Sequence, residues 1–174
     1  AFMNPMDRTP NVMGMGMKKV VVAYLADQLG EVAENVQVTS DSVLFEISDT
    51  VLFDYASTTP SGQFGGVMEK VQGVIAGLED TDLTVTSMVY TQSTRDDNPK
   101  AAKSIAQKRL DILSKKVERT LEHESVDIYG RAVVKDDKRI GKERNISSGT
   151  IKFELKQKNL TSDGKKPRPL QSEV

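Results

Sequence analysis

The residues of this 174-residue chain that could do chemistry are carboxylates, amides and basic side chains. It has no cysteine and a single histidine, His123, which excludes a thiolate nucleophile, a disulfide framework and a histidine-rich metal site. No H-E-x-x-H, G-x-S-x-G or glycine-rich phosphate loop occurs. The sequence therefore favours a non-catalytic binding protein, with no metal or cofactor, over an enzyme.

The polar loop QSTRDDNP, residues 92–99, contains Asp96 and Asp97 and lies between two periodic segments. Taken singly, the other charged candidates have ordinary structural explanations. Asp54 is expected to hydrogen-bond within its own turn, and Arg109 is expected to be a solvated cation on a basic helix. A ligand role for either residue therefore needs a wider pattern.

Charge is divided unevenly between the two halves of the chain. Residues 1–94 hold four basic and twelve acidic side chains, a net charge of −8, and residues 95–174 hold twenty basic and thirteen acidic ones, a net charge of +7. Such a division is typical of two oppositely charged faces of one domain, or of a face that meets an anionic partner. No aromatic residues alternate with the basic ones, which argues against nucleic-acid binding.

Hydrophobic periodicity predicts the elements that must position these residues. The expected strands are 36–40 and 43–48, as a hairpin or one bent strand, then 51–53, 83–91, 126–134 and 149–158. Amphipathic helices are expected at 17–34, after Pro60, and at 99–122. Pro60 suits the first turn of the second helix, and Thr58 or Thr59 could cap it.

The helix at 99–122 has an apolar stripe that is expected to face the core. Its members are Ala102, Ala106, Leu110, Leu113, Val117 and Leu121. Because helices and strands are mixed along one short chain, we expect an α/β (α+β) sandwich: a mixed sheet with helices on one face, preceded by a short amphipathic helix.

The ends of the chain are expected to be peripheral. Residues 1–16 are predicted to be a flexible lead-in, 17–34 a linker helix and 158–174 a disordered tail. No apolar run approaches the roughly 20 residues of a membrane span. Because the sequence starts at Ala1 rather than at a methionine, we expect an excised piece whose membrane segment lay upstream.

Four motifs in a fixed order suggest a family. VLFDYAS precedes a helix, VYT ends a strand, AQKRL lies in a helix and IYGRA ends the next strand. Over residues 43–157 this order resembles the OmpA-like peptidoglycan-binding domain, with its F-D-x-x-S/A, G-Y-T-D, L-S-x-x-R-A and G-x-G-x motifs. The upstream helix makes MotB-type stator proteins the nearest subgroup. The resemblance implies an OmpA-like βαβαβ-type fold for residues 36–157.

The resemblance also implies a ligand, the diaminopimelate side chain of a peptidoglycan stem peptide, whose free end carries an ammonium and a carboxylate. By the motif, Arg109 meets the carboxylate, which arginine can bind bidentately. Gln92 replaces the aspartate that meets the ammonium, so it offers a hydrogen bond without a negative charge. The remaining ligand-binding candidates are Thr91, Asp54, Asp96 and Asp97.

Two functions remain open from the sequence. One is a non-catalytic, stator-like anchor that fixes a membrane complex to peptidoglycan; the other is a degenerate domain that has lost wall binding and serves protein–protein assembly. The resemblance implies a periplasmic domain tethered to the inner membrane, and a homodimer formed through the third-strand region or the 17–33 helix. A membrane partner would be reached through the N-terminal segment.

Overall fold

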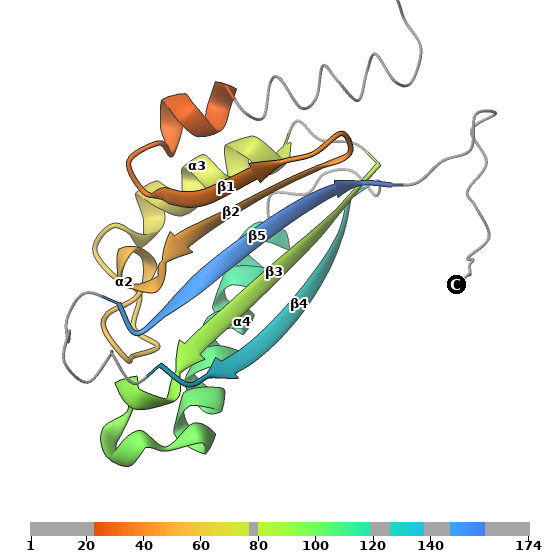
Figure 1. Ribbon diagram of the computed structural model, residues 1–174. Helices are drawn as coiled ribbons and strands as arrows, with labels where there is room; N and C mark the ends of the chain where they lie inside the picture. The colour runs from red at the N-terminus through yellow and green to blue at the C-terminus, as the bar shows by residue number, and fades with distance from the viewer. Residues whose placement is uncertain (1–22, 77–79, 119–125, 138–146, 159–174) are drawn as a thin grey trace, which may run out of the picture.

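A five-stranded mixed sheet forms the centre of the molecule (Figure 1). The computed structural model describes residues 23–76, 80–118, 126–137 and 147–158. The strands are β1 (Ala33–Val38), β2 (Ser42–Ser48), β3 (Thr81–Tyr90), β4 (Val126–Lys135) and β5 (Gly149–Gln157). In the order β1-β2-β5-β3-β4, only the β3–β4 pair is parallel. The predicted mixed sheet is confirmed, and so is the hairpin, formed by β1 and β2.

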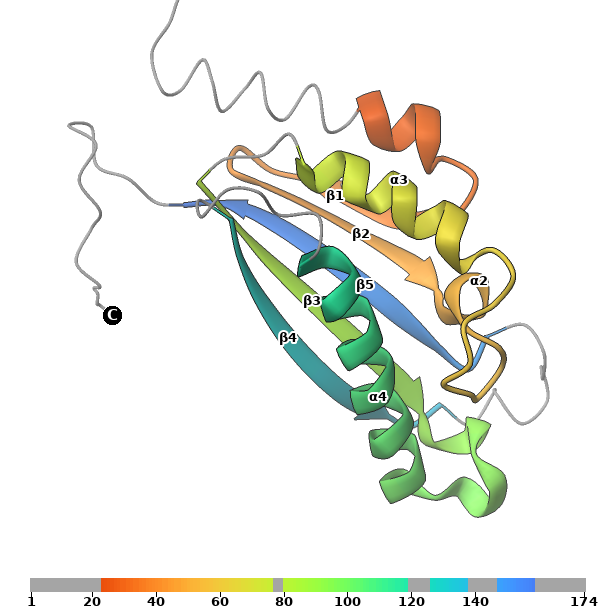
Figure 2. The same ribbon diagram turned by 180° about the vertical axis from the view of Figure 1, so that it is seen from behind.

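Two main helices, α3 (Phe64–Ala76) and α4 (Pro99–Glu118), cover one face of this sheet (Figure 2). Helix α4 is the crossover between the parallel strands and packs on both. Side chains of β3 alternate as predicted, with Leu83, Val85 and Val89 buried beneath the helices. The core therefore lies between the helices and this face, which agrees with the α+β sandwich expected from the sequence.

The N-terminal helix ends earlier than predicted. Among the described residues, 23–28 are helical, and β1 begins at Ala33, inside the range expected to be helix. Gly30 lies just after the boundary, in a tight turn where a side-chain Cβ would lie 2.5 Å from the main-chain oxygen of Ala26. Leu25 and Leu29 are nevertheless buried in the core, so the helix packs on its own domain.

The segment predicted as a strand at 51–53 is instead a short helix, α2 (Asp49–Leu52). Leu52 and Phe53 are fully buried, so the sequence indicated their burial correctly but not their backbone conformation. A short apolar run has the same appearance in a strand and in a buried helical turn. Here the chain turns because the side chain of Asp49 is held by partners far away in the sequence.

Pro60 does not open the following helix, as the sequence suggested. It forms an isolated antiparallel bridge with Phe53, and α3 starts only at Phe64. The main-chain N–H of Gln63 donates to Ser61 Oγ at 3.2 Å, so Ser61, rather than Thr58 or Thr59, supplies a side-chain acceptor in the turn just before α3. The loop between β2 and α3 is therefore longer than predicted and passes across the end of the sheet.

The opposite face of the sheet has no described helix upon it (Figures 1 and 2). Side chains on this open face come from the alternate strand positions, such as Thr84, Thr86 and Met88 of β3. Tyr129 of β4 is 53% exposed there. The sheet thus separates a buried helical side from a solvated side.

Candidate functional site

Helix α4 places Arg109 on the side that faces the sheet. Positions spaced by three or four residues are buried along this helix: Ala102, Ala106, Arg109, Leu113 and Val117. Leu110, which periodicity placed in the stripe, is only half-buried. The expectation that Arg109 is solvated is wrong, because its side chain has no exposed surface and has found a buried carboxylate.

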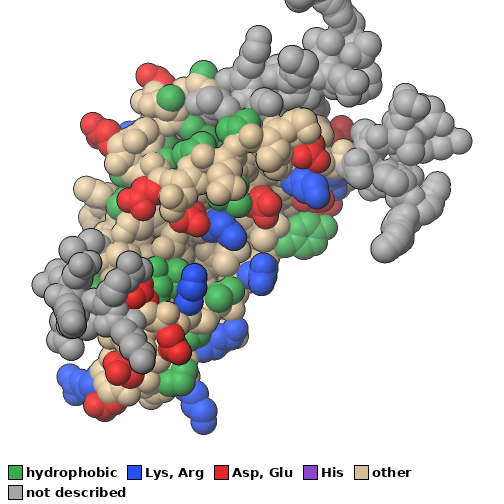
Figure 3. Space-filling view, viewed as in Figure 1, with side chains coloured by type: hydrophobic (Ala, Val, Ile, Leu, Met, Phe, Trp, Pro, Cys, Tyr) green, Lys and Arg blue, Asp and Glu red, His purple; other side chains and the backbone are tan. Residues whose placement is uncertain are grey.

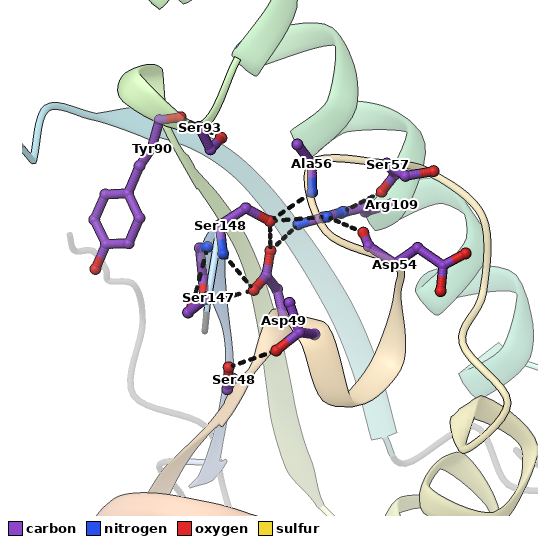
Figure 4. Close-up of polar contacts among 12 residues, drawn as sticks. Ser48, Asp49, Asp54, Ala56, Ser57, Tyr90, Ser93, Arg109, Ser147 and Ser148 are labelled. Carbon is purple, nitrogen blue, oxygen red and sulfur yellow. Dashed lines mark hydrogen bonds and ion pairs between the residues drawn. The ribbon is translucent and has the colours of Figure 1, made fainter. Parts of the chain in front are cut away.

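All three guanidinium nitrogens of Arg109 donate hydrogen bonds inside the protein (Figure 4). Nη1 lies 2.5 Å from Asp49 Oδ2, and Nε lies 2.8 Å from the main-chain oxygen of Ser57. Nη2 donates to the main-chain oxygen of Asp54 at 3.2 Å and to Ser148 Oγ at 3.3 Å. The guanidinium is therefore surrounded by acceptors from three separate segments.

Asp49, the acidic partner, begins helix α2 and is also fully buried. Its Oδ1 accepts the main-chain N–H of Ser148 at 3.0 Å and the hydroxyl of Ser147 at 3.2 Å. Its Oδ2 accepts from Arg109 and from the hydroxyl of Ser148. These donors replace the water that burial removes from the carboxylate.

We call the set Asp49, Asp54, Ser57, Arg109 and Ser148 the Arg109 cluster. It joins the end of β2, the turn at 54–57, α4 and the start of β5. The guanidinium also lies 5.2 Å from the centre of the Phe53 ring, which adds a cation–π contact. Since an unpaired charge would then remain buried, removing either ion-pair partner is expected to cost about 3–5 kcal/mol.

Gln92 lies in the short 3-10 helix η1 (Thr91–Ser93), directly after β3. Its Oε1 accepts the main-chain N–H of Asp137 at 2.7 Å, which joins this loop to the end of β4. Thr91 is buried, 5% exposed. The side-chain oxygen of Gln92, predicted to contact a ligand, therefore already accepts a hydrogen bond within the protein.

The two acids of the loop, Asp96 and Asp97, lie in the second 3-10 helix, η2 (Arg95–Asp97), and are exposed. Both have positive φ angles, 63° and 48°, a conformation that aspartate tolerates better than most residues. The side chain of Asp54 is exposed as well, although its main-chain oxygen belongs to the Arg109 cluster. These three carboxylates are the accessible negative charges of the predicted site.

The predicted site residues are thus distributed between one buried cluster and one surface loop. The structure brings Asp54 and Arg109 into contact through the main chain. The loop after β3 approaches the cluster where the N–H of Tyr90 donates to the oxygen of Ser148 at 2.9 Å. Gln92 follows Tyr90 by two residues, but its side-chain oxygen accepts from Asp137 and not from Arg109.

Sequence reasoning missed Asp49 and Ser148, although they hold Arg109 in place. A signal was present for Asp49: it directly follows the alternating strand 43–48 and precedes an apolar run, so its neighbours were expected to be buried. A carboxylate in such a position needs a cationic or donor partner. No comparable signal exists for Ser148, which ends a charged connection.

The arrangement supports binding or structural roles. In the described ranges, no group of three or more histidine, cysteine, aspartate or glutamate residues could hold a metal ion. Over the same ranges, no helix is both long and apolar enough to cross a membrane. The exposed acids and the neighbouring turn leave a polar rim that could meet a charged ligand.

No family model matches the sequence, and no curated protein matches it. Solved structures do resemble the fold. A MotB-like protein from Desulfovibrio vulgaris superposes with a TM-score of 0.58 at 9% identity, over 83% of this chain and 91% of that one. The cell wall anchor of the T6SS from Pseudomonas aeruginosa superposes with a TM-score of 0.53 at 15% identity, over 79% and 96% of the two chains.

A periplasmic domain of MotB also superposes, with a TM-score of 0.50 at 10% identity, over 90% of this chain and 88% of that one. At such identities the likeness concerns the path of the backbone. It agrees with the mixed sheet, the helices on one face and the order of elements. The chain therefore shares its fold with the MotB-like protein and with the periplasmic domain of MotB.

Proposed function

We propose that this chain is a non-catalytic anchoring domain of the bacterial cell envelope that binds the stem peptide of peptidoglycan. The observation that carries the proposal is the fold shared with the cell wall anchor of the T6SS. Arg109 supports it, since it occupies the position of the ligand-binding arginine in the OmpA-like motif. In this role the domain fixes a stator-like membrane complex to the wall.

The Arg109 cluster suggests how a ligand carboxylate is bound. Nε and Nη2 of Arg109 are held by main-chain oxygens of the half-buried to exposed turn 54–57. A ligand carboxylate forms stronger hydrogen bonds than these neutral oxygens, so it can exchange with one of them while the Asp49 pair stays intact. The turn must shift outward to admit it.

The ammonium of the same ligand needs a negative partner, and Gln92 has no charge. Asp96 and Asp97 are exposed in the loop beside the cluster, and Asp54 is exposed on the turn. We assign the ammonium to these acids, with Gln92 and Thr91 shaping the loop that presents them. A charged hydrogen bond to one acid contributes about 1.5–3 kcal/mol.

Sedimentation with purified diaminopimelate-type peptidoglycan tests this assignment. Asp96→Asn/Asp97→Asn is expected to leave the fold intact and to reduce the pelleted fraction about tenfold at limiting wall. The matched control is Glu69→Gln/Asp111→Asn, which removes two exposed charges from α3 and α4. Equal pelleting of both double variants would exclude the loop acids from the site.

A second function, protein–protein assembly by a domain that has lost wall binding, is favoured by two contacts. The guanidinium of Arg109 already has four acceptors, and Gln92 Oε1 already accepts from Asp137. In this case wild-type protein does not pellet with the wall, whereas Gln92→Asp, which restores the motif's acid, does. Wild-type pelleting that depends on Asp96 and Asp97 excludes it.

The stator-like role also includes a homodimer, a periplasmic location and a tether to the inner membrane. The resemblance to MotB supports these three features. Light scattering of the purified chain measures its mass in solution. If the chain is a monomer at every concentration tested, then this chain does not form the dimer contacts by itself.

A further inference from the structure

The open face of the sheet carries a hollow of about 260 Å³ that lies over β2, β3, β4 and β5. Three cations line it, Arg131, Lys135 and Lys152, together with Thr86 and the apolar pair Met88 and Val133. We call this hollow the open-face groove. Figure 3, which views the same side as Figure 1, shows basic side chains on this face of the molecule. The groove is on the side of the sheet away from α4 and the Arg109 cluster.

Strand register places three of these residues in one row across the sheet. Thr86 of β3 pairs with Lys152 of β5 on one side and with Arg131 of β4 on the other. Since neighbouring strands lie about 4.8 Å apart, the two cations flank Thr86 within about 10 Å of each other at the backbone. The row continues to Glu46 of β2, the partner of Lys152, and from there to Glu34 of β1.

Among the described residues, the cations of the groove form no ion pair, although Glu46, the cross-strand partner of Lys152, also lines the groove. In contrast, Lys158 near the end of β5 contacts two aspartates. Between Arg131 and Lys152, the hydroxyl of Thr86 is buried and has no hydrogen-bond partner, with the residue only 7% exposed. A buried hydroxyl without a partner costs about 1–3 kcal/mol, so an acceptor entering here would relieve that cost.

We propose that the open-face groove binds an extended, acidic segment of a partner protein, whose carboxylates enter between Arg131 and Lys152 and continue toward Lys135. Arg131 can hold a carboxylate bidentately, and an oxygen between the two cations gives the Thr86 hydroxyl its missing acceptor. Met88 and Val133 offer apolar contact to the segment beside the charges. The inference is independent of the proposed wall binding.

A peptide carboxylate fits this groove better than a phosphate does. Phosphate sites usually rely on free main-chain N–H groups at helix N-termini or in loops. The N–H groups of β3 are instead engaged in ladders with β4 and β5 on both sides. The hydrogen-bond donors of the groove are therefore side chains, and together with its apolar surface they suit an extended peptide.

The positions of the charges also define the path of the segment. Arg131 and Lys135 are four residues apart on β4, which corresponds to about 13 Å along a strand. Two acids four residues apart in an extended segment match that distance. Glu46, at the β2 position of the row, repels an anion and restricts the acidic segment to the side of β3 and β4.

Fluorescence anisotropy of a labelled peptide in which glutamate alternates with threonine tests the proposal on the whole chain. Wild-type protein is expected to bind this peptide and not a matched peptide with glutamine in place of glutamate, and to release it as salt is raised. Arg131→Gln/Lys135→Gln should weaken binding about 10-fold to 100-fold, and Thr86→Val several-fold. Unfolding curves check that each variant remains folded.

Lys70→Gln/Lys115→Gln is the matched control, since it removes two exposed lysines from α3 and α4, on the other face. It should leave peptide affinity unchanged. An equal loss in this control, or equal binding of tripolyphosphate, shows a general charge attraction and overturns the proposal. Sedimentation with peptidoglycan is the second control. If wild type pellets and Arg131→Gln/Lys135→Gln does not, the groove binds the wall rather than a protein segment, which also overturns the proposal.

Discussion

Arg109 and Arg131 both belong to the basic second half of the chain, and the fold uses them in opposite ways. Arg109 has no exposed surface, and Asp49, 60 residues away in sequence, neutralises it at 2.5 Å. Arg131 is exposed on the open face and has no acidic partner among the described residues. An arginine of this chain therefore stabilises the fold where a distant segment supplies a carboxylate, and remains available to a partner where no carboxylate is supplied.

The largest expected effect is on the buried side of this comparison. Arg109→Met keeps most of the side-chain volume but leaves Asp49 buried without its cation, so we expect a loss of about 3–5 kcal/mol in the free energy of unfolding. Arg131→Met, on the open face, should change it by no more than about 0.5 kcal/mol. Urea unfolding followed by circular dichroism measures both values.

The double variant Asp49→Leu/Arg109→Met tests whether the loss in Arg109→Met comes from the unpaired charge of Asp49. Because no charge then remains buried, it should recover part of the stability lost in Arg109→Met. Equal losses in Arg109→Met and Arg131→Met would contradict the division between buried and available cations.

The next effect concerns the hydroxyl that bridges the ion pair. Ser148→Ala removes a donor to Asp49 Oδ2 and an acceptor of Arg109 Nη2, both buried, so we expect a loss of about 1–3 kcal/mol. Ser104→Ala, at an exposed position of α4, is the control and should be neutral or slightly stabilising. Thermal and urea unfolding report the two variants, and a neutral Ser148→Ala would show that the hydroxyl contributes nothing.

The third substitution, unlike the first two, is expected to stabilise the protein. Thr86→Val replaces the buried hydroxyl that lacks a partner by a methyl group of similar size, so it should raise the free energy of unfolding by up to about 1 kcal/mol. The same change is expected to weaken peptide binding. A stability loss of the size seen for Ser148→Ala would mean that the hydroxyl has a partner inside the folded protein.

The smallest effect is expected from a surface ion pair. A hydrogen bond to Asp127, with the charge of Asp82 nearby, raises the pKa of Lys158 above its ordinary 10.5. Because the folded pKa is the higher one, this contribution is complete below pH 10.5 and disappears as the pH rises through the raised value. Lys158→Gln should therefore cost less than about 1 kcal/mol at neutral pH.

Unfolding of wild type and Lys158→Gln, compared at neutral pH and well above pH 10.5, measures this dependence. The two proteins should differ at neutral pH and converge in strong base. A difference that grows with pH would contradict the assigned direction of the pKa shift.

Strand and helix types could mostly be read from hydrophobic period, because each period matches one face that must be buried. The alternation of Leu83, Val85 and Val89 predicted β3 correctly, and the stripe of Ala102, Ala106 and Leu113 predicted the buried side of α4. The prediction was wrong at residues 49–64. There the path of the chain depends on side-chain partners near β5 and on α4, and the local pattern of apolar residues does not indicate those partners.

Part of the candidate site could also be predicted from the sequence. Motif order singled out Arg109 and the loop after β3, and the structure brings that loop to the same end of the sheet. Which atoms Arg109 binds could not be predicted, because Ser57, Asp49 and Ser148 lie 39 to 60 residues from it in sequence. No local pattern encodes contacts at such separations.

The class of fold, the buried faces of the main elements and the lack of cysteine chemistry all follow from the amino-acid sequence alone. Those properties depend on residue type and short-range period, which act within a few turns or strands. The three-dimensional arrangement was needed to show that Arg109 is enclosed with Asp49, whereas Arg131 and Lys152, in the described part of the chain, flank Thr86 without an ion pair. Strand order and crossover cause this difference, since they determine which distant charges meet.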